Sequence, residues 1–210
     1  MRATPNVSLL ARLCVAVALL AVPLQSAAAE TRSATAIVTG FYDTLLATMK
    51  NGPALKFSGR VEALTPALDS AFDLASMTRI AAGAQWLGIK PEDQLQLIDS
   101  FSRFSVASYA ANFDSWSGER FEVVKETPAP GSGNGIIVET RLIPKTGDSV
   151  QLNYLLRPGS GGLRVIDVFV NGTISELAAR RSEFGSVLAR DGAKGLREML
   201  DSRVKDLASK

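Results

Sequence analysis

Apolar side chains recur every three or four residues through the first part of the chain, which is the repeat of an amphipathic helix. The clearest example covers residues 37–49, where apolar and aromatic side chains fall on one side. Gly52-Pro53 follows directly and is expected to end this helix. A second helical region begins near Leu55. The pattern therefore predicts a first half built from helices.

Further signals divide this helical half. Thr65-Pro66 has the composition of an N-cap followed by a first-turn proline, and it is expected to start another helix. Asp73 is placed to cap a further turn or two. A long helix is then predicted over residues 91–113, with an apolar side that begins at Leu95.

From residue 120 onward the period of the pattern falls from about 3.6 to 2, which is typical of strands. Short connections rich in glycine and proline separate the alternating segments, and they favour antiparallel neighbours. Four strands are predicted, over residues 120–126, 136–143, 149–157 and 163–170. In the third strand, the side chains that face one way are all apolar or aromatic: Val150, Leu152, Tyr154 and Leu156. That strand therefore covers something on one side only.

A polar residue and a tight turn mark the last predicted strand. Asp167 stands between apolar neighbours, and Asn171-Gly172 is the pair expected of a tight turn. An amphipathic helix follows the turn. Asp191-Gly192 is expected to break that helix, and a last helix completes the chain.

The order of elements predicts an α+β fold, in which helices pack on one face of a curved four-stranded antiparallel sheet, as in an NTF2-like cone. Such a cone can enclose an apolar cavity between the sheet and the helices. The pattern of residues leaves open whether that space is filled by side chains or stays empty.

The N-terminus has the features of a secretory signal peptide. Two arginines form a basic region, residues 13–24 are almost entirely apolar, and three alanines at 27–29 form a small-residue cleavage site. The apolar run is too short for a membrane span, which needs about 20 residues. The prediction is a signal peptide over residues 1–29 and a single domain over residues 30–210, exported as a soluble protein.

Composition removes several classes of mechanism. The chain has no histidine, and its one cysteine, Cys14, lies in the predicted signal peptide. Disulfides, cysteine nucleophiles and Ser-His-Asp triads are thereby excluded from the mature protein, and zinc loses its usual ligands. The chain has 23 basic against 21 acidic residues, and two arginines leave with the signal, so the mature protein is electrically balanced. This gives no support for nucleic acid binding, and no metal or cofactor is expected.

Several motifs resemble the MlaC family of periplasmic lipid carriers, also called toluene-tolerance proteins. The segment after the last strand reads Gly172-Thr-Ile-Ser-Glu-Leu and continues as Arg180-Arg181-Ser-Glu-Phe, which is similar to the C-terminal signature of that family. The sequence of this segment is most similar to that of the hopanoid-associated branch of the family, HpnM. Gly83-x-x-Trp86, within the central region, is similar to another motif of the family. The resemblance covers nearly the whole mature chain.

The resemblance implies a monomeric carrier in the periplasm that holds the tails of a phospholipid or a hopanoid-type lipid and shuttles it between inner and outer membranes. The implied partners are an inner-membrane lipid transport complex and an outer-membrane acceptor. Such a carrier is not an enzyme. The candidate lipid-binding residues are Phe101, Tyr109, Phe113, Val138, Leu152, Tyr154, Val165, Ile174, Leu177 and Phe184.

Polar residues of the C-terminal half have separate interpretations. Arg180, Arg181 and Arg190 are candidates for docking to partners. Arg180 and Arg181 could meet either a phosphate or an acidic partner surface, although most arginine pairs on helices are simply solvated. Asp167 and Gly172 are interpreted as structural, because a buried carboxylate needs hydrogen-bond partners and an Asn-Gly turn needs its glycine.

Two alternatives remain open at this stage. One is an exported enzyme in which Asp167 and either Tyr154 or Tyr109 transfer protons. The other is an interaction module of the cell envelope with a filled core and no ligand.

Overall fold

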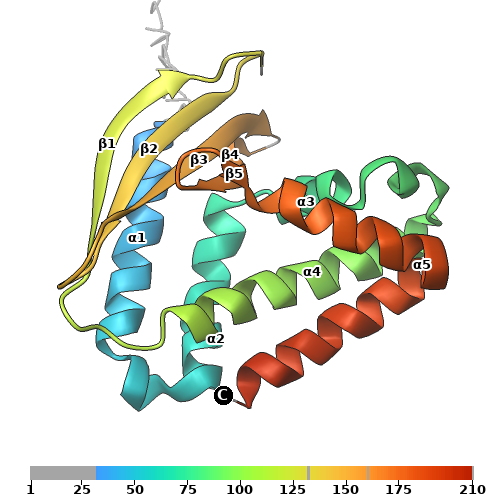
Figure 1. Ribbon diagram of the computed structural model, residues 1–210, viewed down its shortest axis with the longest axis horizontal. Helices are drawn as coiled ribbons and strands as arrows, with labels where there is room; N and C mark the ends of the chain where they lie inside the picture. Colours follow the sequence, from blue (N-terminus) through green and yellow to red (C-terminus); the bar gives the residue numbers. More distant parts are fainter. Residues whose placement is uncertain (1–31, 132, 160, 210) are drawn as a thin grey trace, which may run out of the picture. The chain divides into compact units, whose positions relative to one another are not determined.

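The computed structural model describes residues 32–131, 133–159 and 161–209, so the predicted signal peptide lies outside the described residues. Helices come first, strands second and a long helix last, in the order expected from the sequence (Figure 1). The helices are α1 Ala34–Lys50, α2 Gly52–Ala71, α3 Leu74–Ala82, the 3-10 helix η1 Gly83–Gly88, α4 Pro91–Asn112 and α5 Glu176–Ala208. Within the described residues, no helix is both long and apolar enough to cross a membrane.

The boundary between α1 and α2 is tighter than the sequence suggested. Gly52-Pro53 ends the first helix as predicted, but it also begins the second. A Cβ atom on Gly52 would lie 1.8 Å from the carbonyl oxygen of Asp114, so this close approach requires glycine. A kink follows at Lys56, where φ is 54° and ψ is −176°.

The prediction of a helix start at Thr65-Pro66 is wrong. Pro66 lies inside α2, and the hydroxyl of Thr65 donates to the carbonyl of Val61 instead of capping a helix. Fully buried Leu64 and Leu68 flank the proline. Their packing against the core outweighs the one backbone hydrogen bond that a proline cannot make.

The other two helix starts agree with the sequence. Asp73 accepts a hydrogen bond from the backbone N–H of Ser76 at 2.8 Å and caps α3. The long helix α4 begins at Pro91. Its apolar side, however, does not reach back to Leu95, whose side chain is 70% exposed.

The sheet has one strand more than predicted. Its strands are β1 Arg120–Pro128, β2 Ile136–Ile143, β3 Val150–Gly159, β4 Gly162–Val170 and β5 Ile174–Ser175, all antiparallel to their neighbours and joined in chain order. At Asn171 and Gly172 φ is positive, 52° and 77°, which turns the chain back so that Ile174 pairs with Val170. A two-residue strand is too short for a pattern of alternation to reveal.

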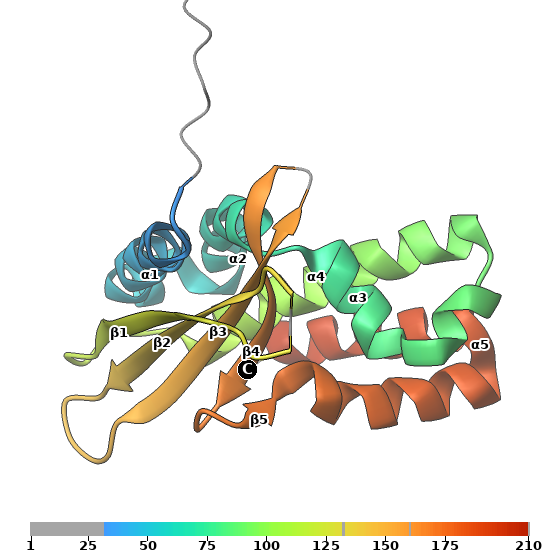
Figure 2. The same ribbon diagram turned by 90° about the horizontal axis from the view of Figure 1, so that it is seen from above.

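Helices cover the inner side of this sheet. The helix α1 packs against β1, β2 and β4, and α2 and α3 contact β4 (Figure 2). At the junction of α2 and α3, the N–H of Asp73 donates to the carbonyl of Val165 at 2.8 Å, which ties the helices to β4. The predicted α+β class, with helices packed on an antiparallel sheet, is confirmed.

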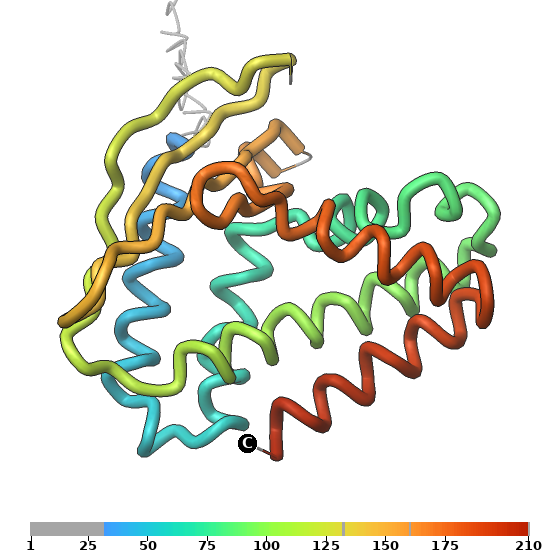
Figure 3. The backbone as a smooth tube through the Cα atoms, in the orientation of Figure 1, coloured from blue at the N-terminus to red at the C-terminus, as the bar shows by residue number. Residues whose placement is uncertain are grey.

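The helix α5 consists of two segments that double back on one another. The kink lies at Gly192, where φ is 66° and ψ is −168°, as the Asp191-Gly192 pair predicted. Beyond it the chain returns beside α4 (Figure 3). Arg203 in the second segment forms a two-contact ion pair with Glu183 in the first.

Candidate functional site

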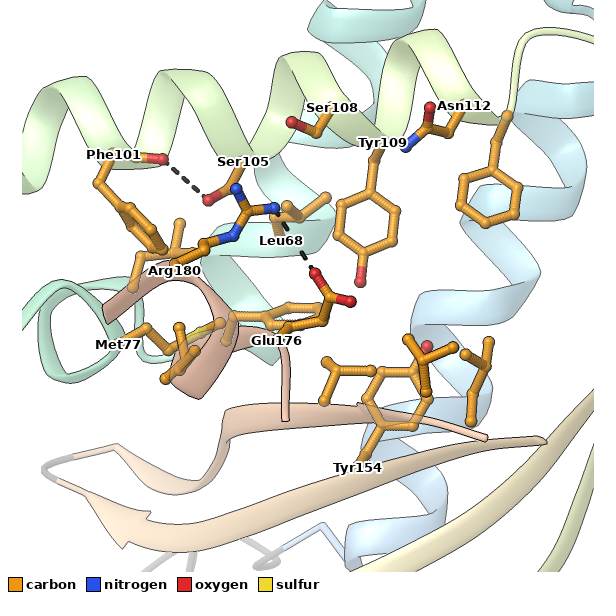
Figure 4. Close-up of a pocket in the computed structure, with 17 residues that line it drawn as sticks. Leu68, Met77, Phe101, Ser105, Ser108, Tyr109, Asn112, Tyr154, Glu176 and Arg180 are labelled. Atoms are coloured by element: carbon orange, nitrogen blue, oxygen red, sulfur yellow. Dashed lines mark hydrogen bonds and ion pairs between the residues drawn. The ribbon is translucent and has the colours of Figure 1, made fainter. Parts of the chain in front are cut away.

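A cavity of about 250 Å³ lies where α4, the first turns of α5, the α2–α3 junction and strands β3 and β4 meet (Figure 4). The sheet contributes two cross-strand pairs, Leu152 with Val170 and Tyr154 with Val168. Directly paired residues point to the same face of a sheet, so the register places all four side chains toward the cavity.

The helix α4 forms the opposite wall. The residues that line the cavity are spaced by three or four positions along α4, which puts them on one side of the helix. This side carries aromatic residues and also polar ones, and it comprises Phe101, Ser105, Ser108, Tyr109, Asn112 and Phe113. The α2–α3 junction adds an entirely apolar wall made of Leu68, Phe72, Leu74 and Met77.

Six of the ten predicted lipid-binding residues line the cavity, namely Phe101, Tyr109, Phe113, Leu152, Tyr154 and Leu177. Val138, Val165 and Phe184 instead pack in the hydrophobic core, each at most 1% exposed and outside the cavity wall. Ile174 belongs to neither group, because its side chain in β5 is 54% exposed. The cavity wall therefore does not include these four residues, and lipid binding by them stays a prediction.

All three tyrosines of the chain meet at the sheet side of the cavity. The rings of Tyr42 and Tyr154 are 5.6 Å apart, nearly perpendicular, and Tyr109 reaches Tyr154 from α4. The hydroxyl of Thr140 donates to the carbonyl of Leu152 at 2.7 Å, so the 2.6 Å contact of Tyr42 with Thr140 is a hydrogen bond donated by the tyrosine. The phenols thus form a short polar chain inside an apolar wall.

Burial governs how these tyrosines titrate. It raises the pKa of Tyr42 to about 12. Burial also raises the pKa of Tyr109 and that of Tyr154 well above their usual value, and the nearby Tyr42 adds to the shift of both. None of them is poised to exchange a proton near neutral pH.

The charged residues of the cavity lie on the first turns of α5. The guanidinium of Arg180 lies 4.8 Å from the ring centroid of Phe104. It also lies 3.7 Å from the carboxylate of Glu176 (Figure 4). Burial lowers the pKa of Arg180, and the nearby Glu176 opposes that shift. This side chain lines the cavity, and its role in docking to partners stays a prediction.

The other two predicted docking residues lie outside the cavity. Arg181 donates to the carbonyl of Ile80 at 3.1 Å and packs beside Gly83. Arg190 is exposed and pairs with the adjacent Asp191 at 2.7 Å. Docking by these two residues remains a prediction.

Asp167 points away from the cavity. It pairs with Leu155 in the register of the sheet, one position from Tyr154, so its side chain emerges on the opposite face from that phenol. Its carboxylate accepts hydrogen bonds from the N–H of Val168 at 2.8 Å, the hydroxyl of Ser175 at 2.6 Å and the N–H of Leu177 at 3.3 Å. This arrangement joins β4, β5 and α5, and it leaves Asp167 outside the proton-transfer pair of the enzyme alternative.

Sequence reasoning missed the polar side of the cavity. Ser105, Ser108 and Glu176 line it but were not among the predicted residues. The spacing of the two serines with Phe101 and Tyr109 along α4 was a usable signal, because it places them on one helical side. Among the described residues, no cluster of three or more acidic, histidine or cysteine side chains could hold a metal ion.

Comparison with known proteins agrees with this geometry. A solved structure of a phospholipid-binding protein from Ralstonia solanacearum, in complex with a phospholipid, superimposes with a TM-score of 0.73 at 25% sequence identity, over 84% of this chain and 99% of the other. None of the curated proteins searched matches the chain. The family model described as MlaC protein matches residues 40–202. The chain therefore belongs to the MlaC family.

Proposed function

We propose that the protein carries a lipid through the periplasm, with the lipid tails held in the cavity between α4 and the strands β3 and β4. The observation that supports this most is the cavity itself, whose walls at the α2–α3 junction and on the sheet are apolar. Membership of the MlaC family and the phospholipid bound by the Ralstonia solanacearum protein point the same way.

The energetics suit a carrier. Each methylene of an acyl chain contributes about 0.8 kcal/mol when it is buried, so a free two-tailed lipid crosses water at negligible concentration. A dry apolar cavity removes that barrier without any catalytic group. The present cavity, at about 250 Å³, lies below the roughly 300–1,000 Å³ of typical ligand pockets. Loading therefore requires the walls to move apart.

A charge placed in the cavity tests this function. Leu152→Asp puts a carboxylate against the tails, which costs several kcal/mol unless it finds a partner, and it should abolish retention of a fluorescent-tailed phospholipid. Ile174→Asp is the matched control, because the same change is made at an exposed position outside the cavity. If folded Leu152→Asp retains the phospholipid at the wild-type level, the proposed site is wrong.

Export and delivery are part of the same proposal. Cleavage after residue 29 would release a mature protein starting at Glu30, which N-terminal sequencing of periplasmic material tests directly. Delivery to an inner-membrane transport complex and an outer-membrane acceptor would use local patches, because the mature chain is electrically balanced. Exposed Arg190 is one candidate. Phospholipid and hopanoid-type lipid are the two ligand classes to be separated.

A further inference from the structure

The cavity combines apolar walls with one pair of opposite charges. Among the seventeen lining residues, Arg180 is the one cation and Glu176 the one anion. Both project from the first turns of α5 toward α4, where Ser105 and Tyr109 lie (Figure 4). A store for acyl tails alone would gain nothing from a charged group, because burying a charge without a close partner is unfavourable.

The positive charge of Arg180 has no carboxylate within hydrogen-bond distance among the described residues. Its distance of 3.7 Å to Glu176 is longer than a hydrogen bond, and it donates none to any residue that the structure describes. Its side chain is only 27% exposed and lies over the Phe104 ring. The pKa of Arg180 is lowered because desolvation, together with the repulsion of Arg203, outweighs the attraction of Glu176 and Glu183. A half-buried guanidinium with five N–H donors, whose carboxylate partner is beyond hydrogen-bond distance, suits a ligand that supplies oxygen atoms.

Resting on the carrier function above, we propose that Arg180 binds the phosphate of the carried lipid and exchanges its distant partner Glu176 for that phosphate. A guanidinium can contact two phosphate oxygens at once, in a geometry that a lysine cannot reproduce. Glu176 is 43% exposed, so its carboxylate can turn to water when the phosphate arrives. The tails then lie toward Leu152 and Phe72, and the head group lies at the start of α5.

The nearby hydroxyl groups support this orientation. Ser105 donates to the carbonyl of Phe101 and Ser108 to that of Phe104, both at 2.8 Å. Since each hydroxyl has a single proton, these serines present only lone pairs to the cavity. With their protons given to these carbonyls they do not donate to a phosphate, and Arg180 is the charged donor among the lining residues.

Two lipids with the same tails, one with a phosphate and one without, distinguish the contribution of the phosphate to binding from that of the tails. Lipid-free protein is titrated with dioctanoylphosphatidylglycerol and with dioctanoylglycerol, and the dissociation constants are compared. Arg180→Gln should weaken binding of the phosphate lipid roughly 10- to 100-fold, the range for losing charge-assisted hydrogen bonds, and leave dioctanoylglycerol unchanged. Arg180→Lys should recover only part of the loss. Glu176→Gln removes the competing carboxylate and should strengthen binding of the phosphate lipid alone.

Arg190→Gln is the matched control, because it removes the same charge from the same helix outside the cavity. It should change neither dissociation constant. Equal changes for the two lipids in the Arg180 variants, or no selective gain in Glu176→Gln, would overturn the assignment of Arg180. Failure of the wild-type protein to bind either lipid would instead overturn the carrier function on which it rests.

Discussion

Asp167 offers the sharpest test of the fold, because three elements depend on one carboxylate. One oxygen, Oδ1, accepts from the N–H groups of both Val168 and Leu177, and the other accepts from Ser175. The N–H of Leu177 lies in the first turn of α5, where helices have no internal acceptor. Removing the carboxylate therefore leaves two buried backbone donors without a partner.

The expected cost follows from that count. A buried donor without a partner costs about 1–3 kcal/mol, so Asp167→Ala should lower the free energy of unfolding by about 2–6 kcal/mol. Asp167→Asn keeps an oxygen at the Oδ1 position for the two N–H groups, but it replaces Oδ2, which accepts from Ser175, with an amide group that cannot accept. Its cost should be about 1–3 kcal/mol. For a chain of this size each kcal/mol corresponds to roughly 2–4 °C in the melting temperature.

Urea unfolding followed by circular dichroism measures both variants, using lipid-free protein because a bound ligand would raise the apparent stability. Lipid binding by Asp167→Asn, measured while it is folded, should equal that of the wild type, since Asp167 faces away from Tyr154 and the cavity. An Asp167→Ala variant as stable as the wild type would refute the structural role. Loss of lipid binding in a stable Asp167→Asn would refute its separation from the site.

Two further predictions concern the backbone and the tyrosines. Gly192→Ala should destabilise the protein by about 1–3 kcal/mol, because the backbone conformation at Gly192 is nearly restricted to glycine. Gly40→Ala, with equally open surroundings in α1, should stabilise the protein by about 0.5–1 kcal/mol. Equal effects of the two substitutions on urea unfolding would contradict this. Because the pKa of Tyr42 is raised to about 12, stability should be complete below pH 10 and fall between pH 10 and 12, as the unfolded chain ionises first. Tyrosinate absorbance in the folded protein that rises with a midpoint near 10 would exclude the buried cluster.

The strands and helix ends could be predicted because their signals are local. Alternation fixed which side chains of β3 share a face, and it placed Leu152 and Tyr154 on the cavity side. A glycine with positive φ marks the break at Gly192. Pro66 misled the prediction because a helix that packs well through its neighbours can tolerate a proline, and that packing is not local.

The extent of the cavity could not be predicted in the same way. Val138 and Tyr154 are paired residues on the same face of the sheet, yet only Tyr154 reaches the cavity, because α1 covers the neighbouring part of β2. The position of Arg180 in the cavity wall could not be predicted for a related reason. Its position on α5 is clear from the sequence, whereas its burial depends on how α4 crosses that helix.

Native mass spectrometry of the protein, purified from the periplasm without added lipid, tests the central claim most directly. The account predicts a species heavier than the mature chain by the mass of a bound lipid, which organic extraction releases and identifies, and which Leu152→Asp lacks while Ile174→Asp retains it. A wild-type protein that is free of lipid as isolated, and that stays free after incubation with phospholipid vesicles, would contradict the account.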